Sequence, residues 1–147
     1  MNLENALIKM QRLLNKAWQA HAEEAGVVLS QNEFEYLACI FAAEKVQPPE
    51  DPQQHDDSAH LSSVAQQMQV RKSSASLMIN KLEKRGFIQR LTCRYDARAQ
   101  HILLTEQGRE VFLSIREQVY GAMASKVKKC LGKKDTSKLK SIAEKLD

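Results

Sequence analysis

The stretch LSSVAQQMQVRKSSASLMINKLEKRGFIQRLTCRYDARAQHILLTEQG, residues 61–108, decides the fold. Its pattern predicts two short helices, at 62–69 and 72–85, with Ser62 as the cap of the first. The second helix has an inward face of apolar residues at three- and four-residue steps, namely Ala75, Met78, Ile79 and Leu82. Gly86 ends it, and two strands are predicted at 87–93 and 100–104, joined by a polar turn.

Helix, tight turn, helix, strand, turn and strand is the order of a winged helix-turn-helix, whose second helix enters the major groove of DNA. Around it, amphipathic periodicity predicts helices over 2–24, 30–44, 105–131 and 136–146. Ser30 with Glu33, and Thr105, supply caps, while Gly26 and Gly132 break helices. The predicted fold class is therefore mainly α with a small β-hairpin wing (α+β).

The charge is distributed unevenly along the chain. The whole chain has a formal net charge of +4, yet residues 61–98 carry eight Lys and Arg against only Glu83 and Asp96. A basic segment of this density attracts a polyanion, although a solvated helix face is the simpler alternative. The loop predicted at 46–60 contains three prolines and four acidic residues, so we expect it to lie away from DNA or to meet another partner.

Other function classes find little support in the sequence. There is no phosphate-binding glycine loop, GxSxG elbow or HExxH motif, so we expect no enzyme and no cofactor. The loop residues His55, Asp56, Asp57 and His60 match no familiar zinc spacing, and we predict no metal site; His101 is expected to be exposed. No apolar run is long enough for a membrane span or a signal-peptide core, so we expect a cytoplasmic protein that does not bind membranes.

The outward face of the helix at 72–85 is the candidate reader of DNA. At 100° per residue, Ser73, Leu77, Asn80 and Lys84 point away from the core, flanked by Ser76 and Lys81. Small hydroxyls and an amide at a helix front can bond base edges, and lysines can pair with phosphates. Asn80 is the best candidate for base reading because an Asn side chain makes a bidentate contact with adenine.

Three motifs make the resemblance specific: LEKRGFIQR at 82–90, DAR at 96–98 and LLTEQG at 103–108. This segment resembles the DNA-binding core of the MarR family. The resemblance implies that Arg98 extends from the wing toward the minor groove and that Asp96 holds the wing. It also implies a dimer formed by the terminal helices. Two departures are Leu77, where many relatives have Arg, and Asp-Ala-Arg in place of Asp-Arg-Arg.

We therefore expect one MarR-like domain over 1–147, with the DNA-binding part at 30–108 and dimerisation helices at 1–25 and 109–147. The expected function is that of a homodimeric repressor that binds a pseudo-palindromic operator in double-stranded DNA. The candidate DNA-contacting residues are Lys72, Ser73, Ser74, Ser76, Leu77, Asn80, Lys81, Lys84, Arg90, Asp96 and Arg98.

The sequence says less about which signal, a small-molecule effector or oxidation of a cysteine, the protein would sense. Family members often release DNA when a small aromatic effector binds, and the residues placed to line such a cleft are Trp18, His21, Phe34, Leu37 and Phe41. Packing in the core is the alternative for all five. Cys93, beside Arg90 and Arg94, is a candidate redox sensor; the alternative is a tolerated cysteine in the wing. Cys39 on an apolar helix face is expected to be inert.

A second function remains open. A winged helix that has lost specific DNA binding would serve as a protein-interaction module, and both Leu77 and the acidic loop favour this alternative. The basic residues of 61–98 argue against it.

Overall fold

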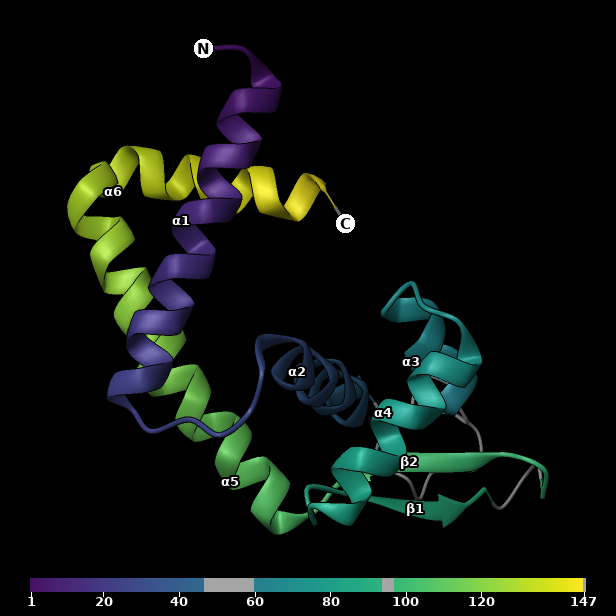
Figure 1. Ribbon diagram of the computed structural model, residues 1–147. Helices are drawn as coiled ribbons and strands as arrows, with labels where there is room; N and C mark the ends of the chain where they lie inside the picture. Colours follow the sequence, from purple (N-terminus) through teal and green to yellow (C-terminus); the bar gives the residue numbers. More distant parts are fainter. Residues whose placement is uncertain (47–59, 94–96, 147) are drawn as a thin grey trace. The chain divides into compact units, whose positions relative to one another are not determined.

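The computed structural model describes residues 1–46, 60–93 and 97–146 (Figure 1). The predicted fold class is confirmed: the described chain is mostly helical with one antiparallel hairpin. The elements are α1 (Leu3–Glu24), α2 (Gln31–Val46), α3 (Leu61–Gln67), α4 (Lys72–Lys84), β1 (Ile88–Thr92), β2 (Gln100–Leu104), α5 (Glu106–Ile115), a π-helical segment (Arg116–Tyr120) and α6 (Gly121–Lys145). Most of the predicted 46–60 loop, and Asp96, lie outside the described residues.

The chain divides into two compact units. The winged unit is Leu29–Leu113, and the terminal unit combines Met1–Val28 with Ser114–Asp147. In the winged unit, α2, α3 and α4 pack with the hairpin around side chains that are almost fully buried: Leu37, Ile40, Val64, Ile79, Leu82 and Ile102. Burial of six large aliphatic side chains gives this unit its own hydrophobic core.

The end of α4 is fixed by Gly86, as the sequence predicts. Gly86 has φ +80°, a left-handed conformation that glycine adopts without a steric penalty. Its N–H donates to the carbonyl of Glu83 at 2.9 Å, and the N–H of Phe87 donates to the carbonyl of Leu82 at 3.0 Å. This pair of bonds is a Schellman motif, and it turns the chain directly from α4 into β1.

The start of α5 joins the helix to this same turn. The hydroxyl of Thr105 accepts a hydrogen bond from the N–H of Gly108 at 3.0 Å, as a cap should, and donates to the carbonyl of Gly86 at 2.5 Å. A Cβ at Gly108 would lie 1.9 Å from the carbonyl oxygen of Phe87, so only glycine fits here. The close approach holds α5 against the end of α4.

The predicted cap of α3 is wrong. The helix begins at Leu61, so Ser62 lies inside it and His60 takes the N-cap position without a side-chain capping bond. The backbone of His60 forms an isolated antiparallel bridge with His101 of β2. Pairing with the strand therefore places the N-cap of α3 two residues earlier than the predicted Ser62 cap.

In the terminal unit, α1 packs against the π-helical segment and α6. The ring centroids of Trp18 and Tyr120 lie 5.6 Å apart, with an angle of 51° between the ring planes. Val119 and Met123, which flank Tyr120 in the sequence, are also buried. The sequence predicts an uninterrupted helix here, and the π-helical turn at Arg116–Tyr120 corrects that prediction. The predicted break at Gly132 is confirmed by its φ of +73°, but the helix resumes directly after it rather than at Thr136.

Candidate nucleic-acid interface

Helix α4 presents a polar outer face from the winged unit. Ala75, Ile79 and Leu82 are buried and hold the helix on the core. The candidate DNA-contacting residues of α4 are mostly exposed: Lys72, Ser73, Ser74, Leu77, Asn80, Lys81 and Lys84 are exposed, and Ser76 is half-buried. Leu77 is 72% exposed, so it contributes nothing to the core of this unit and is available for contact with a partner.

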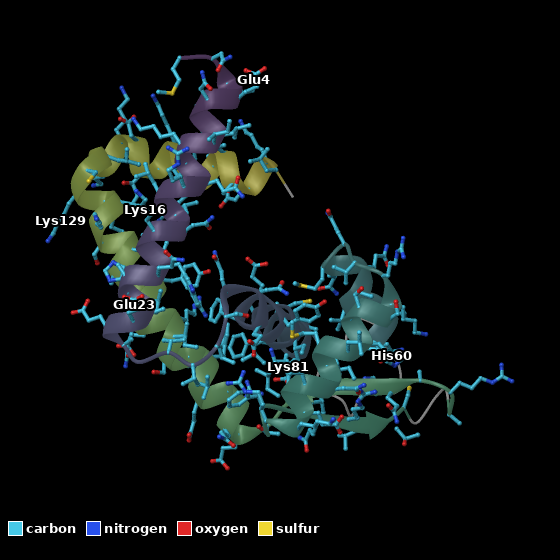
Figure 2. The ribbon with its side chains drawn as sticks, in the orientation of Figure 1. Glu4, Lys16, Glu23, His60, Lys81 and Lys129 are labelled. Atoms are coloured by element: carbon cyan, nitrogen blue, oxygen red, sulfur yellow. The ribbon has the colours of Figure 1, made fainter. Side chains whose placement is uncertain are left out.

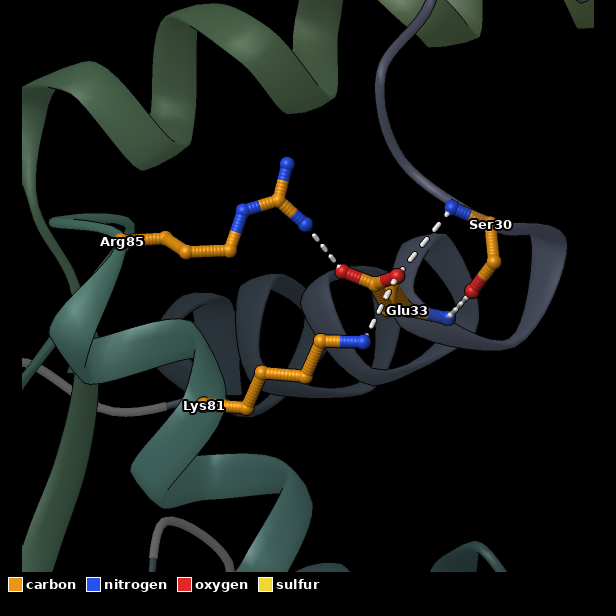
Figure 3. A network of polar contacts seen from close by, with 4 residues as sticks. All are labelled: Ser30, Glu33, Lys81 and Arg85. Carbon is orange, nitrogen blue, oxygen red and sulfur yellow. Dashed lines mark hydrogen bonds and ion pairs between the residues drawn. The ribbon is translucent and has the colours of Figure 1, made fainter.

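A buried carboxylate fixes the position of α4 against the start of α2 (Figure 3). Glu33 and Ser30 form the predicted capping box: the N–H of Glu33 donates to the Ser30 hydroxyl at 3.1 Å, and the N–H of Ser30 donates to Glu33 Oε1 at 3.4 Å. The same carboxylate pairs with Arg85 at the end of α4, and with Lys81, whose Nζ lies 3.4 Å from Oε1. Glu33 thus connects two helices through one side chain.

The electrostatics of Glu33 follow from these contacts. Burial alone would raise the pKa of Glu33, but the hydrogen bonds from Ser30 and the positive charges of Arg85 and Lys81 outweigh it and hold the pKa below its usual value. The carboxylate is therefore ionised at neutral pH. Lys81, predicted as a phosphate contact, consequently shares its charge with Glu33 while its side chain remains 58% exposed.

A second polar network lies between α4 and the hairpin. The guanidinium of Arg90 on β1 donates through Nε to Glu83 at 3.0 Å, through Nη2 to the amide oxygen of Asn80, and through Nη1 to Gln100 at 3.5 Å. Arg90 was predicted to contact phosphate. Its side chain is 20% exposed and contacts the predicted base reader, Asn80. The sequence gives no sign of this network, because it depends on how the hairpin packs on α4.

The hairpin has a regular register that runs from Ile88 opposite Leu104 to Thr92 opposite Gln100. Its inner end is held by Glu44 of α2, which accepts a hydrogen bond from the N–H of Leu104 at 2.6 Å and pairs with Arg109 of α5. Arg98 is exposed in the turn beyond the strands, at the position expected of a wing tip. Asp96, which the resemblance expects to hold the wing, lies outside the described residues.

The five predicted effector-binding residues are divided between the two units. Trp18, whose ring contacts that of Tyr120, and half-buried His21 belong to the terminal unit. The other three, Phe34, Leu37 and Phe41, are buried in the winged unit. The ring of Phe112 lies 5.3 Å from that of Phe34 and 4.5 Å from that of Phe41. These ring contacts correspond to packing in the core, which the sequence analysis gave as the alternative to effector binding.

The cysteines differ in their surroundings. Cys39 is half-buried, and burial raises the pKa of its thiol, which disfavours the reactive thiolate as expected. Cys130 is exposed. Cys93 is buried beside the two histidines His60 and His101. The expectation that His101 is exposed is wrong, because the bridge with His60 leaves it half-buried.

Comparison with protein families gives one match. The MarR family model matches residues 54–99, which include α3, α4 and β1. The comparison with curated protein sequences returns no match. Among the described helices, none is both long and apolar enough to cross a lipid bilayer.

Solved structures share the fold along nearly the whole chain. Apo MarR from E. coli superposes with a TM-score of 0.72 at 15% identity, covering 99% of this chain and 97% of that one. The transcriptional repressor CouR bound to a 23-mer DNA duplex gives 0.73 at 17% identity, covering 99% and 92%.

MepR from S. aureus in complex with DNA gives 0.72 at 14% identity, covering 99% of this chain and 96% of that one. The same protein has also been solved with ethidium bromide. At these identities the likeness establishes the fold, while the family match concerns the segment that contains α4. The chain therefore has the MarR-type winged-helix fold, and its residues 54–99 match the MarR family model.

Proposed function

We propose that this protein is a sequence-specific DNA-binding transcription regulator rather than an enzyme. The observation that carries the proposal is the exposed polar and basic face of α4, packed beside a hairpin wing in a unit of MarR-type fold. In a winged helix-turn-helix, such a helix enters the major groove, and the wing contacts the adjacent backbone or minor groove. CouR and MepR, which share the fold, have been solved with DNA.

Base reading is assigned to the outward residues of α4. Asn80 is exposed, and its amide oxygen contacts the Arg90 guanidinium, which orients the amide. An oriented amide loses less conformational freedom on binding than a mobile one, so it discriminates bases better. Ser73 and Ser76 add hydroxyl donors, and Leu77 offers an apolar contact for a thymine methyl group.

Phosphate contacts are assigned to the exposed cations of the same unit. Lys72 and Lys84 lie at the two ends of α4, and Arg98 lies in the wing. An arginine in a narrow minor groove meets enhanced negative potential, which suits Arg98. We assign Arg90 the role of positioning Asn80, because its guanidinium already contacts Glu83.

The proposed assembly is a homodimer formed by the terminal unit. Helix α1 exposes a series of large apolar side chains: Leu3, Leu7, Ile8, Met10, Leu13 and Leu14. Helix α6 adds Leu131 and Ile142, also about half exposed. Exposed apolar side chains in this number are unfavourable in water and favour association with a second copy. Its twofold symmetry would present two copies of α4 to a pseudo-palindromic operator.

Repression of transcription in the cytoplasm, with release by a small aromatic effector, completes the proposal. It is supported by CouR, described as a transcriptional repressor, and by MepR, which has been solved with ethidium bromide. Candidate effectors can be tested by measuring the DNA affinity of the protein at constant salt. An aromatic compound that lowers this affinity is an effector, and a compound that leaves it unchanged is not an effector.

The experiment that tests the function has two stages. Duplexes that bind the wild-type protein are first selected from a random pool. Fluorescence anisotropy then measures the affinities of Asn80→Ala and Arg98→Ala for the selected duplex, for single-base variants of it, and for a scrambled duplex. We expect Arg98→Ala to weaken binding to all duplexes, and Asn80→Ala to reduce discrimination at one base position by about 1–3 kcal/mol.

The matched control is Lys129→Ala, which removes one exposed positive charge from α6 in the terminal unit (Figure 2). It should bind the selected duplex like the wild type. If Asn80→Ala retained the wild-type ranking of all single-base variants, its role in base reading would be wrong. If selection enriched no sequence and the protein instead captured a protein partner, the interaction-module alternative would replace the regulator.

A further inference from the structure

Three metal-ligating side chains meet near the turn end of the hairpin, away from the end that Glu44 holds. They are His60, Cys93 and His101, and one ligand atom of each lies within 4.8 Å of the corresponding atoms of the other two. His60 is marked in Figure 2 beside the hairpin. The residues are separated by 33 and 8 positions in the sequence, so only the fold brings them together.

The backbone explains why they converge. His60 bridges His101 in antiparallel fashion, while His101 pairs with Leu91 on its other side. The N–H of Cys93 donates to the carbonyl of Ala99 at 3.0 Å, so the antiparallel pairing continues past the end of β1. Side chains alternate along a strand, and Cys93 therefore lies on the same face as Leu91 and His101. Paired backbone from three segments holds the cluster.

The chemistry of the cluster is that of a zinc site. Two imidazoles and one thiolate are nitrogen and sulfur ligands, which zinc(II) prefers, whereas calcium and magnesium require oxygen ligands. Three protein ligands leave the fourth tetrahedral position for a water molecule. His60 and Cys93 are buried and His101 is half-buried, so the ion would reach the cluster from the His101 side.

The distances are close to those that zinc requires. Zinc–nitrogen bonds of about 2.0 Å and zinc–sulfur bonds of about 2.3 Å place tetrahedral ligand atoms about 3.3–3.7 Å apart. The ligand atoms here lie within 4.8 Å of one another, so each pair needs to approach by at most about 1.5 Å. The histidine rings are in edge-to-face contact, with centroids 4.5 Å apart, and rotation about side-chain bonds provides a movement of this size.

We propose that His60, Cys93 and His101 bind one zinc(II) ion per chain. The ion would join the N-terminus of α3 to both strands of the hairpin and so fix the wing on the helix-turn-helix. A fixed wing lowers the ordering cost of DNA binding, so zinc is expected to strengthen it. This last consequence, unlike zinc binding itself, rests on the proposed function.

The test uses full-length protein, stripped of metal with a chelator and kept reduced. Zinc(II) is titrated against a colorimetric competitor, and cobalt(II) is used as a spectroscopic substitute. We expect one equivalent of either metal per chain, and a thiolate-to-cobalt charge-transfer band in the near ultraviolet. Cys93→Ser should abolish that band, and His60→Gln and His101→Gln should each weaken zinc binding at least about tenfold.

The matched controls are Cys130→Ser and His21→Gln, which change a cysteine and a histidine elsewhere in the chain and should leave metal binding unchanged. Far-ultraviolet circular dichroism verifies that each variant is folded, and Cys93→Ala provides a second, apolar replacement of the thiol. Folded wild-type protein that binds no zinc, or a cobalt band that persists in Cys93→Ser, would overturn the proposal and leave the cluster as ring and thiol packing.

DNA binding is measured separately, with and without zinc, by anisotropy. Zinc should raise the DNA affinity of the wild type and have no effect on Cys93→Ser. Zinc binding without any DNA binding would contradict the proposed function while supporting the metal site. Selective DNA binding by a protein that binds no zinc would support the proposed function and contradict the metal site.

Discussion

The substitution Glu33→Gln tests whether one buried carboxylate holds α4 in place. Glutamine keeps the size of the side chain and can still accept the capping-box bond from Ser30, so the helix cap is preserved. What is lost is the negative charge opposite Arg85 and Lys81. The change therefore isolates the ion pairs from the packing and the cap.

The magnitude follows from the exposure of the partners. The Arg85 side chain is 29% exposed, so its charge-assisted hydrogen bond is partly screened and is worth about 1–1.5 kcal/mol. The Lys81 side chain is 58% exposed, and its pair adds about 0.5 kcal/mol or less. We expect Glu33→Gln to lower the free energy of unfolding by about 1–2 kcal/mol at pH 7, or about 5 °C in Tm.

The effect should depend on pH. The folded pKa of Glu33 lies below the ordinary value of 4.5, so its ionised form stabilises the fold above the unfolded pKa. That stabilisation is lost as the pH falls below 4.5 and through the folded pKa. The stability difference between wild type and Glu33→Gln should therefore be full at pH 7 and shrink in acid.

The assay is urea unfolding at pH 7 and in a series of acidic buffers, at one fixed chain concentration because dimerisation would add to stability. Glu35→Gln is the matched control, since Glu35 is an exposed glutamate on the same helix and should change stability by less than about 0.5 kcal/mol. Equal losses for the two variants at pH 7, or a difference that does not shrink in acid, would refute the reasoning.

Four further substitutions test other parts of the winged unit. Ile79→Ala, at a fully buried position of α4, should cost about 3 kcal/mol in urea unfolding, whereas Leu77→Ala on the exposed face should cost less than about 0.5 kcal/mol; equal costs would contradict the assigned faces. Gly108→Ala should cost about 2–3 kcal/mol, because the new Cβ would overlap the carbonyl of Phe87; a neutral result in the same assay would contradict that close approach. Arg90→Gln should reduce anisotropy-measured affinity for the selected duplex more than for a scrambled one, and a uniform reduction would instead indicate a phosphate contact.

Local signals in the sequence were sufficient for most of the fold. The inward face of α4, its end at Gly86 and the Thr105 cap each depend on residues within one turn of a helix, and each is present in the structure. Prediction from local signals failed where a segment that is distant in the sequence determines the start of a helix. Ser62 has the chemistry of a cap, but pairing of His60 with β2 places the start of α3 earlier.

The candidate site could be predicted only in outline. The outward residues of α4 follow from helical periodicity alone. The contacts of Arg90 with α4, and of Glu44 with the end of β2, depend on packing between elements and leave no pattern in the sequence. The same limit applies to the histidine–cysteine cluster, whose ligand spacing of 33 and 8 residues resembles no short metal motif.

The most direct test of the central claim is an anisotropy titration of wild-type protein against the selected duplex and a scrambled duplex at about 50 and 200 mM salt. Two chains would present six exposed cations, namely Lys72, Lys84 and Arg98 from each. Release of that many counterions lowers affinity on the order of 10³-fold between those salt concentrations. The account predicts tight, salt-weakened binding with a strong preference for the selected duplex; equal weak binding to both duplexes, or none at the lower salt, would contradict it.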